Sequence, residues 1–95
     1  MQRLFTVIME FRGTTSISQF VAEDPQSAMK LWQEGLAGPD PYGLSDSSAR
    51  RLLKAALAQE PCDVPVPLEG LKSVWCRTVL AGGQLALLNI VKTSR

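Results

Sequence analysis

The stretch that most constrains the fold of this chain is residues 70–93, GLKSVWCRTVLAGGQLALLNIVKT, near its C-terminal end. Two runs rich in aliphatic, aromatic and β-branched residues, 74–80 and 85–92, flank the pair Gly82-Gly83. Glycine reaches positive φ without a Cβ clash, so this pair suits a two-residue turn between antiparallel strands. The stretch therefore predicts a β-hairpin.

The two-residue turn also sets the register of this hairpin, because directly opposed residues share one face of a sheet. One face is expected to carry Val74, Cys76, Thr78, Leu80, Leu85, Leu87, Asn89 and Val91. The other face is expected to carry Trp75, Arg77, Val79, Ala86, Leu88 and Ile90. A strand buried on one side only would alternate apolar and polar residues, which residues 85–91 do not. Each face should therefore be covered.

Length and composition indicate a single globular domain over residues 1–95, with 45% hydrophobic and 20% charged residues. The net charge of +1 gives no general attraction to nucleic acid or to a membrane. No apolar run approaches the roughly 18 residues that span a bilayer. Glu10 soon interrupts the first apolar run, so no signal peptide is expected. We expect a cytoplasmic protein without membrane contact.

A second hairpin is predicted at the other end of the chain. Residues 4–11 alternate cleanly, with aromatic and aliphatic side chains at every second position. Gly13 suits the first position of a type II′ turn, and a return strand should run over 15–22. In that register Val7 opposes Phe20 and Phe5 opposes Ala22. This hairpin has one apolar and one mixed face.

Two helices follow. Asp24 can cap a helix that has Pro25 at its first position, and Gly35 or Gly38 is expected to end it. The apolar stripe of this helix is Ala28, Met29, Trp32 and Leu36. After a loop over 38–48, Ser45 or Asp46 should cap a second helix over about 47–59. The proline-rich residues 61–67 then favour an extended segment.

The order β-β-α-α-β-β predicts an α+β fold, a four-stranded antiparallel sheet with two helices packed on one face. Two helices cannot also cover the second face, so an apolar side of the C-terminal hairpin should stay open. An open apolar patch on a small domain is typical of an association surface, most often a two-fold dimer. Alternatively the sheet curls on itself, or the proline-rich segment lies over the patch.

Catalytic chemistry finds little support in this sequence. The chain has no histidine, and its serines near Asp46 are typical of a helix cap. The carboxylates are scattered, and no phosphate-binding glycine motif occurs. Cys62 and Cys76 lack metal-site spacing and are expected to be reduced, although a disulfide between them is an alternative. We expect a non-enzymatic protein with no cofactor and no metal.

Two further groups are candidate binding sites. Arg50, Arg51 and Lys54 form a short basic group, which without a nucleic-acid-binding module is more typical of a solvated helix face. Nucleic acid is therefore not the expected partner. Tyr42, the only tyrosine, lies in a loop rich in glycine and proline that suits either a connector or a binding loop.

The sequence thus favours a protein-interaction module that associates with itself or with another protein. The candidate interaction residues are Trp75, Arg77, Leu85, Leu87, Asn89 and Val91. Arg77 is expected to pair with a carboxylate such as Glu10 across the sheet, or to lie at a subunit contact. In size and element order the chain resembles small bacterial antitoxin and immunity domains, which implies an inhibitor that binds protein. The alternative is a regulatory domain that binds a small ligand or nucleic acid on the open face.

Overall fold

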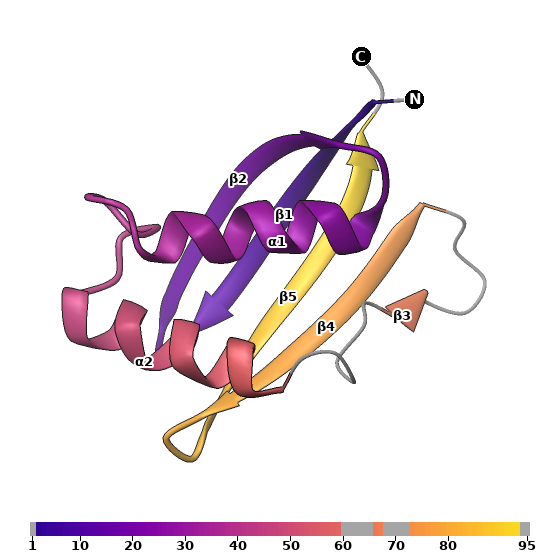
Figure 1. The fold of residues 1–95 in the computed structure, drawn as a ribbon. Helices are drawn as coiled ribbons and strands as arrows, with labels where there is room; N and C mark the ends of the chain where they lie inside the picture. The colour runs from indigo at the N-terminus through magenta and orange to yellow at the C-terminus, as the bar shows by residue number, and fades with distance from the viewer. Residues whose placement is uncertain (1, 60–65, 68–72, 94–95) are drawn as a thin grey trace.

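Two long antiparallel hairpins form the sheet of the computed structural model, which describes residues 2–59, 66–67 and 73–93. The first hairpin consists of β1 (Arg3–Phe11) and β2 (Thr14–Ala22), and the second of β4 (Val74–Ala81) and β5 (Gln84–Thr93). Between them come α1 (Pro25–Leu36), α2 (Asp46–Ala58) and the two-residue strand β3 (Val66–Pro67). Figure 1 shows the hairpins side by side beneath the helices.

The strand order is β2-β1-β5-β4-β3, and every neighbouring pair is antiparallel. The first and last long strands of the chain, β1 and β5, therefore lie together in the middle of the sheet (Figure 1). The predicted α+β fold with two helices and an antiparallel sheet is confirmed. The short strand β3 adds a fifth member that was not predicted, beside β4.

The predicted register of the C-terminal hairpin is confirmed along its whole length. Leu80 pairs with Leu85, Cys76 with Asn89, and Val74 with Val91. Both turn glycines have positive φ, 58° for Gly82 and 79° for Gly83, as a two-residue primed turn requires.

The predicted register of the N-terminal hairpin is wrong by two residues. Phe5 pairs with Phe20, and Phe11 pairs with Thr14 across the two-residue turn Arg12-Gly13. Both turn residues have positive φ, 51° and 80°, so Arg12 takes a left-handed conformation that the sequence gives no reason to expect. A shift by two keeps each side chain on its predicted face, because strand side chains alternate with period two.

Both helices begin where their capping residues predict. Asp24 caps α1 by accepting a hydrogen bond from the Ser27 N–H at 2.7 Å, with Pro25 in the first turn. Ser45 caps α2 by accepting from the Ser48 N–H at 3.2 Å. These bonds satisfy amide groups that have no partner within a helix. Hydrogen bonds from Ser27 also lower the pKa of the Asp24 carboxyl.

Of the two glycines expected to end α1, Gly35 lies inside the helix, which continues to Leu36, whereas Gly38 directly follows the C-cap residue Ala37. A Cβ on Gly35 would lie 2.0 Å from the Tyr42 hydroxyl oxygen, so the glycine makes room for the tyrosine. Tyr42 stacks on Trp32 with ring centroids 5.5 Å apart and donates a hydrogen bond to the Trp32 carbonyl at 2.7 Å. The loop after α1 is thereby held against the helix.

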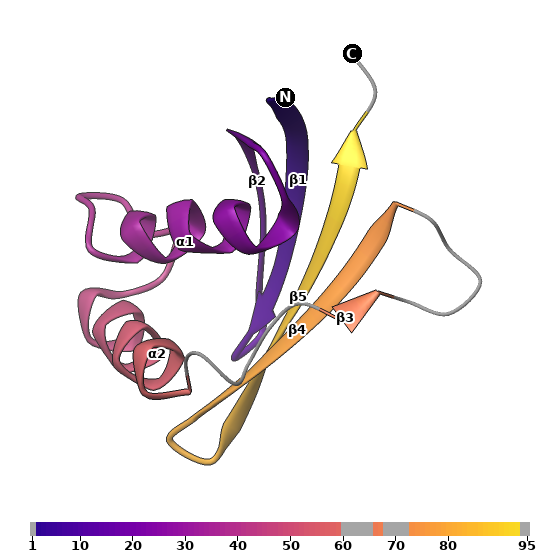
Figure 2. The ribbon, with the colours of Figure 1, turned by 45° about the vertical axis from the view of Figure 1, so that its right-hand side comes forward.

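Both helices pack on the same face of the sheet, as Figure 2 shows with the sheet nearly edge-on. The core between the two layers is built from alternate residues of the strands and the inner stripes of the helices. Its largest fully buried side chains are Trp32, Phe5, Phe11, Met9, Met29, Leu52, Leu88, Ile90, Val7 and Val79. No described helix is long and apolar enough to cross a membrane.

Candidate interaction surface

The face of the sheet turned away from the helices, here called the open face, is formed by the four long strands β2, β1, β5 and β4. Its side chains form rows across these strands, because paired residues share a face. One row reads Ile17, Ile8, Asn89, Cys76; the row on one side reads Thr15, Glu10, Leu87, Thr78; the row on the other reads Gln19, Thr6, Val91, Val74. No described helix packs on this face (Figure 2).

Aliphatic side chains dominate the open face. They are Leu4, Ile8, Ile17, Val21, Val74, Leu80, Leu85, Leu87 and Val91. Several are strongly exposed, with Ile17 at 68%, Leu80 at 59% and Leu85 at 57%. Glu10 is the only charged side chain in the three rows described above, and it lies near the end of β1. A contiguous apolar surface of this kind is typical of an association surface.

Besides Glu10, Thr15 and Thr78, two polar features interrupt this apolar surface. At one end, the Thr6 and Thr93 hydroxyls lie 2.5 Å apart, and the Gln19 side chain donates to Thr6 at 3.1 Å. In the middle, Asn89 lies between Ile8 and Cys76 on the neighbouring strands. The threonine cluster satisfies its own polar groups, whereas no described residue hydrogen-bonds the half-buried Asn89 carboxamide.

The six predicted interaction residues fall on two faces. Leu85, Leu87, Asn89 and Val91 lie on the open face as one group along β5. Trp75 lies on the helix-facing side of the sheet, where its ring meets Phe5 edge-on at a centroid distance of 6.0 Å. Arg77 lies on that covered face too.

Arg77 is only 3% exposed, because its side chain runs between the sheet and both helices. Its guanidinium donates to the Gln33 side-chain oxygen of α1 and to the Ala56 carbonyl of α2 at 3.3 Å. Glu10 lies on the opposite face, so the expected pairing of Arg77 with Glu10 is wrong. The buried arginine connects α1 and α2 to β4. Its hydrogen bonds within the protein replace the hydrogen bonds to water that the guanidinium gives up on burial.

Half of the open face comes from the first hairpin, which the sequence did not place in the site. Leu4, Ile8, Ile17 and Val21 join it because β1 pairs with β5 in the middle of the sheet. The sequence signal that could have identified these residues is their alternation with the buried residues of the same hairpin, such as Phe5 and Val7. Alternation identifies a face but not the strand that will lie beside it.

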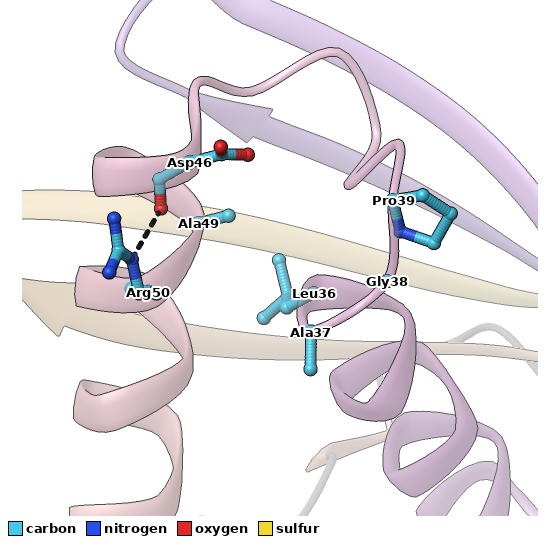
Figure 3. A pocket seen from close by; sticks show the side chains of 7 residues that line it. All are labelled: Leu36, Ala37, Gly38, Pro39, Asp46, Ala49 and Arg50. Atoms are coloured by element: carbon cyan, nitrogen blue, oxygen red, sulfur yellow. Dashed lines mark hydrogen bonds between the residues drawn. The ribbon is translucent and has the colours of Figure 1, made fainter.

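A hollow of about 460 Å³ lies between the C-terminal end of α1 and the start of α2 (Figure 3). Leu36, Ala37, Gly38, Pro39, Asp46, Ala49 and Arg50 line it. Arg50 donates from Nε to the Asp46 carbonyl of its own helix at 3.4 Å. The charged residues of this hollow, Asp46 and Arg50, thus both come from the start of α2, and their side chains do not converge on a position where a ligand could bind.

The other sequence candidates are placed as follows. Arg50, Arg51 and Lys54 are exposed on α2. The Tyr42 ring turns inward onto Trp32, so it supports the connector interpretation of its loop.

Cys76 carries a free, half-buried thiol on the open face. Cys62 and most of the proline-rich segment lie outside the described residues. Among the described residues, no three potential metal ligands of the histidine, cysteine or carboxylate kinds come together.

Comparison with known proteins finds no matching family model, no matching curated protein and no matching solved structure. The functional argument therefore rests on the surface of this chain alone.

Proposed function

We propose that this protein is a non-enzymatic interaction module that associates with a second copy of itself through the open face. The single observation that carries this proposal is the largely aliphatic surface across β2, β1, β5 and β4, on which no described helix packs. Burying such surface is favourable by about 25 cal/mol per Å². Because Cys76 carries a free thiol, and thiols stay reduced in the cytosol, we further propose that the protein is cytoplasmic.

The size of the open face supports a second copy as the partner. Four strands about 4.8 Å apart and about nine residues long form a face of roughly 19 by 30 Å, or on the order of 570 Å². This is the same order as the roughly 800 Å² that each partner contributes to a stable interface. Two sheets pack well face to face because their aliphatic rows interdigitate about 10 Å apart.

The proposal is tested by placing a charge in the middle of the open face. Leu87→Asp should lower the mass of the assembly in size-exclusion chromatography with light scattering, because a carboxylate would be buried without a partner in the open-face contact. The matched control is Leu57→Asp on the exposed side of α2, which should leave the mass unchanged. An unchanged mass for a folded Leu87→Asp protein would rule out the open face as the interface.

A further inference from the structure

The two edges of the sheet differ in how many of their outward-pointing backbone N–H and C=O groups have hydrogen-bond partners. On the β4 edge, β3 pairs with Cys76 and Trp75. Further along that edge, the Gln59 side chain donates to the Leu80 carbonyl at 3.0 Å and accepts from the Leu80 N–H at 3.4 Å. The carboxamide of Gln59 thus takes the place of a neighbouring strand there. The β4 edge is protected at both ends.

The β2 edge has no comparable protection. Its nine residues, TTSISQFVA, include no charged residue and no proline, the two devices that usually blunt an exposed edge. A hydrogen-bonded pair closes a two-residue turn, so Thr14 and every second residue after it bond to β1. The backbone groups of Thr15, Ile17, Gln19 and Val21 therefore point outward, and none of them bonds to another described element.

We propose that β2 pairs antiparallel with β2 of a second copy, so that two sheets join into one continuous sheet. Only a register centred on Ser18 overlaps all nine residues of both strands. In this register the outward groups of Ile17 meet those of Gln19 in the second copy, and Thr15 meets Val21. The outward-pointing residues of one strand thus oppose those of the other, as an antiparallel ladder requires.

Charge complementarity at the strand ends supports the same register. Continuing the pairing by two residues places Arg12 of one copy opposite Asp24 of the other, with Glu23 next to it. All three side chains are exposed, and the contact occurs twice because the pairing is two-fold symmetric. The Asp24 carboxyl has a lowered pKa, so it carries its negative charge at neutral pH. Opposite charges therefore meet at both ends.

Ser18 lies at the centre of this register and would face Ser18 of the second copy. Paired residues that do not exchange backbone bonds approach to about 4.5 Å between Cα atoms, and serine is small enough for this close pair.

Edge pairing is compatible with association through the open face and does not depend on it. The two-fold axis of the edge pairing is perpendicular to the sheet, whereas that of face-to-face packing lies between the two sheets. Perpendicular two-fold axes that meet close into a four-copy assembly. In it, two continuous sheets pack face to face, with the helices outside.

A charge-exchange experiment tests the register. Arg12→Asp and Glu23→Arg are prepared separately in the Leu87→Asp background, which removes association through the open face, and the two proteins are mixed. In the Arg12→Asp dimer a carboxylate meets Asp24 and Glu23 at both ends, and in the Glu23→Arg dimer two cations meet the single carboxylate of Asp24 at both ends. The mixed dimer restores the contact of Arg12 with Asp24 and Glu23 at one end and brings one cation to two carboxylates at the other. Native mass spectrometry should show the mixed dimer bound about tenfold more tightly than either like pair. A statistical mixture of dimers, or monomers alone in the parent Leu87→Asp protein, would overturn the register.

A proline substitution tests the ladder itself. Gln19→Pro removes one outward N–H without touching the bonds to β1, and Gln19→Ala is the matched control that keeps this N–H. Gln19→Pro should halve the mass of the wild-type assembly, and Gln19→Ala should preserve it. Circular dichroism checks that both variants fold.

The two proposals fail in different ways. If Gln19→Pro keeps the wild-type mass, edge pairing is wrong and the open-face proposal is untouched. If Leu87→Asp keeps that mass while Gln19→Pro lowers it, the edge proposal stands and the open-face proposal fails. A wild-type protein that is monomeric at all concentrations overturns both.

Discussion

Tyr42 shows how one side chain couples a loop to the core and makes stability depend on pH. Burial raises the pKa of Tyr42 to about 12. The folded protein therefore holds the phenolic proton more tightly than the unfolded chain, whose tyrosine has a pKa near 10. The resulting stability is complete below about pH 10 and is lost as the pH rises toward 12.

We expect the free energy of unfolding of the wild-type protein to fall more steeply above pH 10 than that of Tyr42→Phe. Phenylalanine keeps the stacking on Trp32 but cannot ionise, so it controls for other alkaline titrations. Below pH 10 the variant should be less stable by about 1 kcal/mol, because the hydrogen bond to the Trp32 carbonyl is lost. Urea unfolding from pH 8 to 12 measures both effects. A difference in the free energy of unfolding that stays constant between the two proteins over this range would contradict the expected pH dependence.

Asn89 places a carboxamide in the middle of the open face, between aliphatic neighbours. When two such faces meet, that carboxamide loses its water, which costs about 1–3 kcal/mol unless a partner replaces it. Asn89→Leu should therefore lower the dissociation constant of the open-face contact about tenfold. Sedimentation equilibrium measures the change, with Gln26→Leu on the exposed surface of α1 as control. Weaker association of the Asn89→Leu protein would instead show that Asn89 finds a hydrogen-bond partner across the contact.

At the residue scale, positions defined by local chemistry could be predicted from the sequence, whereas positions defined by distant contacts could not. Asp24 and Ser45 cap helices because a side-chain oxygen can reach an N–H three residues later. Arg77 was placed on the correct strand face, but its partners come from α1 and α2. No local pattern predicts that Gln33 and Ala56 lie above it.

Helix α1 shows at the element scale why a glycine can be needed inside a helix. Alanine is a better helix former than glycine by about 1 kcal/mol, yet a Cβ on Gly35 would overlap the Tyr42 side chain. Gly35→Ala should therefore lower the free energy of unfolding by about 1–3 kcal/mol, because Tyr42 must leave its position on Trp32. Thermal unfolding measures this loss.

The same substitution in a Tyr42→Ala background is the control. With the ring removed, only the helix propensity of alanine remains, so Gly35→Ala should then be neutral or stabilising. Equal losses in both backgrounds would mean that Tyr42 is not the cause.

The two hairpins show how far turn chemistry predicts register. Gly82-Gly83 offers one obvious two-residue turn, and the predicted register of β4 and β5 is correct. In the first hairpin the turn is Arg12-Gly13, with arginine at positive φ, a conformation that most side chains avoid. The predicted glycine-first turn was therefore reasonable but wrong. Only the period-two alternation kept the faces correct.

For the whole molecule, the sequence predicts the number of long strands and the layers but not the strand order. β1 and β5 pair over seven residue pairs although they lie at opposite ends of the chain. This non-local pairing combines the mixed face of the first hairpin with the face of the second that carries Leu87. The predicted candidate surface was for that reason only half complete, and it included Trp75 and Arg77 from the covered face.

The resulting molecule has one layer of helices, one sheet and an apolar sheet face on which no described helix packs. If that face is the interface, its exposed leucines must become inaccessible in the native assembly. Leu80 and Leu85 on this face and Leu57 on α2 have similar exposures in the single chain, 59%, 57% and 53%. These three leucines provide an internal comparison within one protein.

The most direct test of the central claim is hydroxyl-radical footprinting of the wild-type protein, read out by mass spectrometry at each leucine. We predict that Leu80 and Leu85 are labelled several-fold more slowly than Leu57 at high protein concentration, and that the rates converge as dilution dissociates the assembly. Both leucines lie away from the β2 edge, so edge pairing alone would not protect them. Equal labelling of the three leucines at every concentration would show that the open face stays in contact with water and would contradict the account.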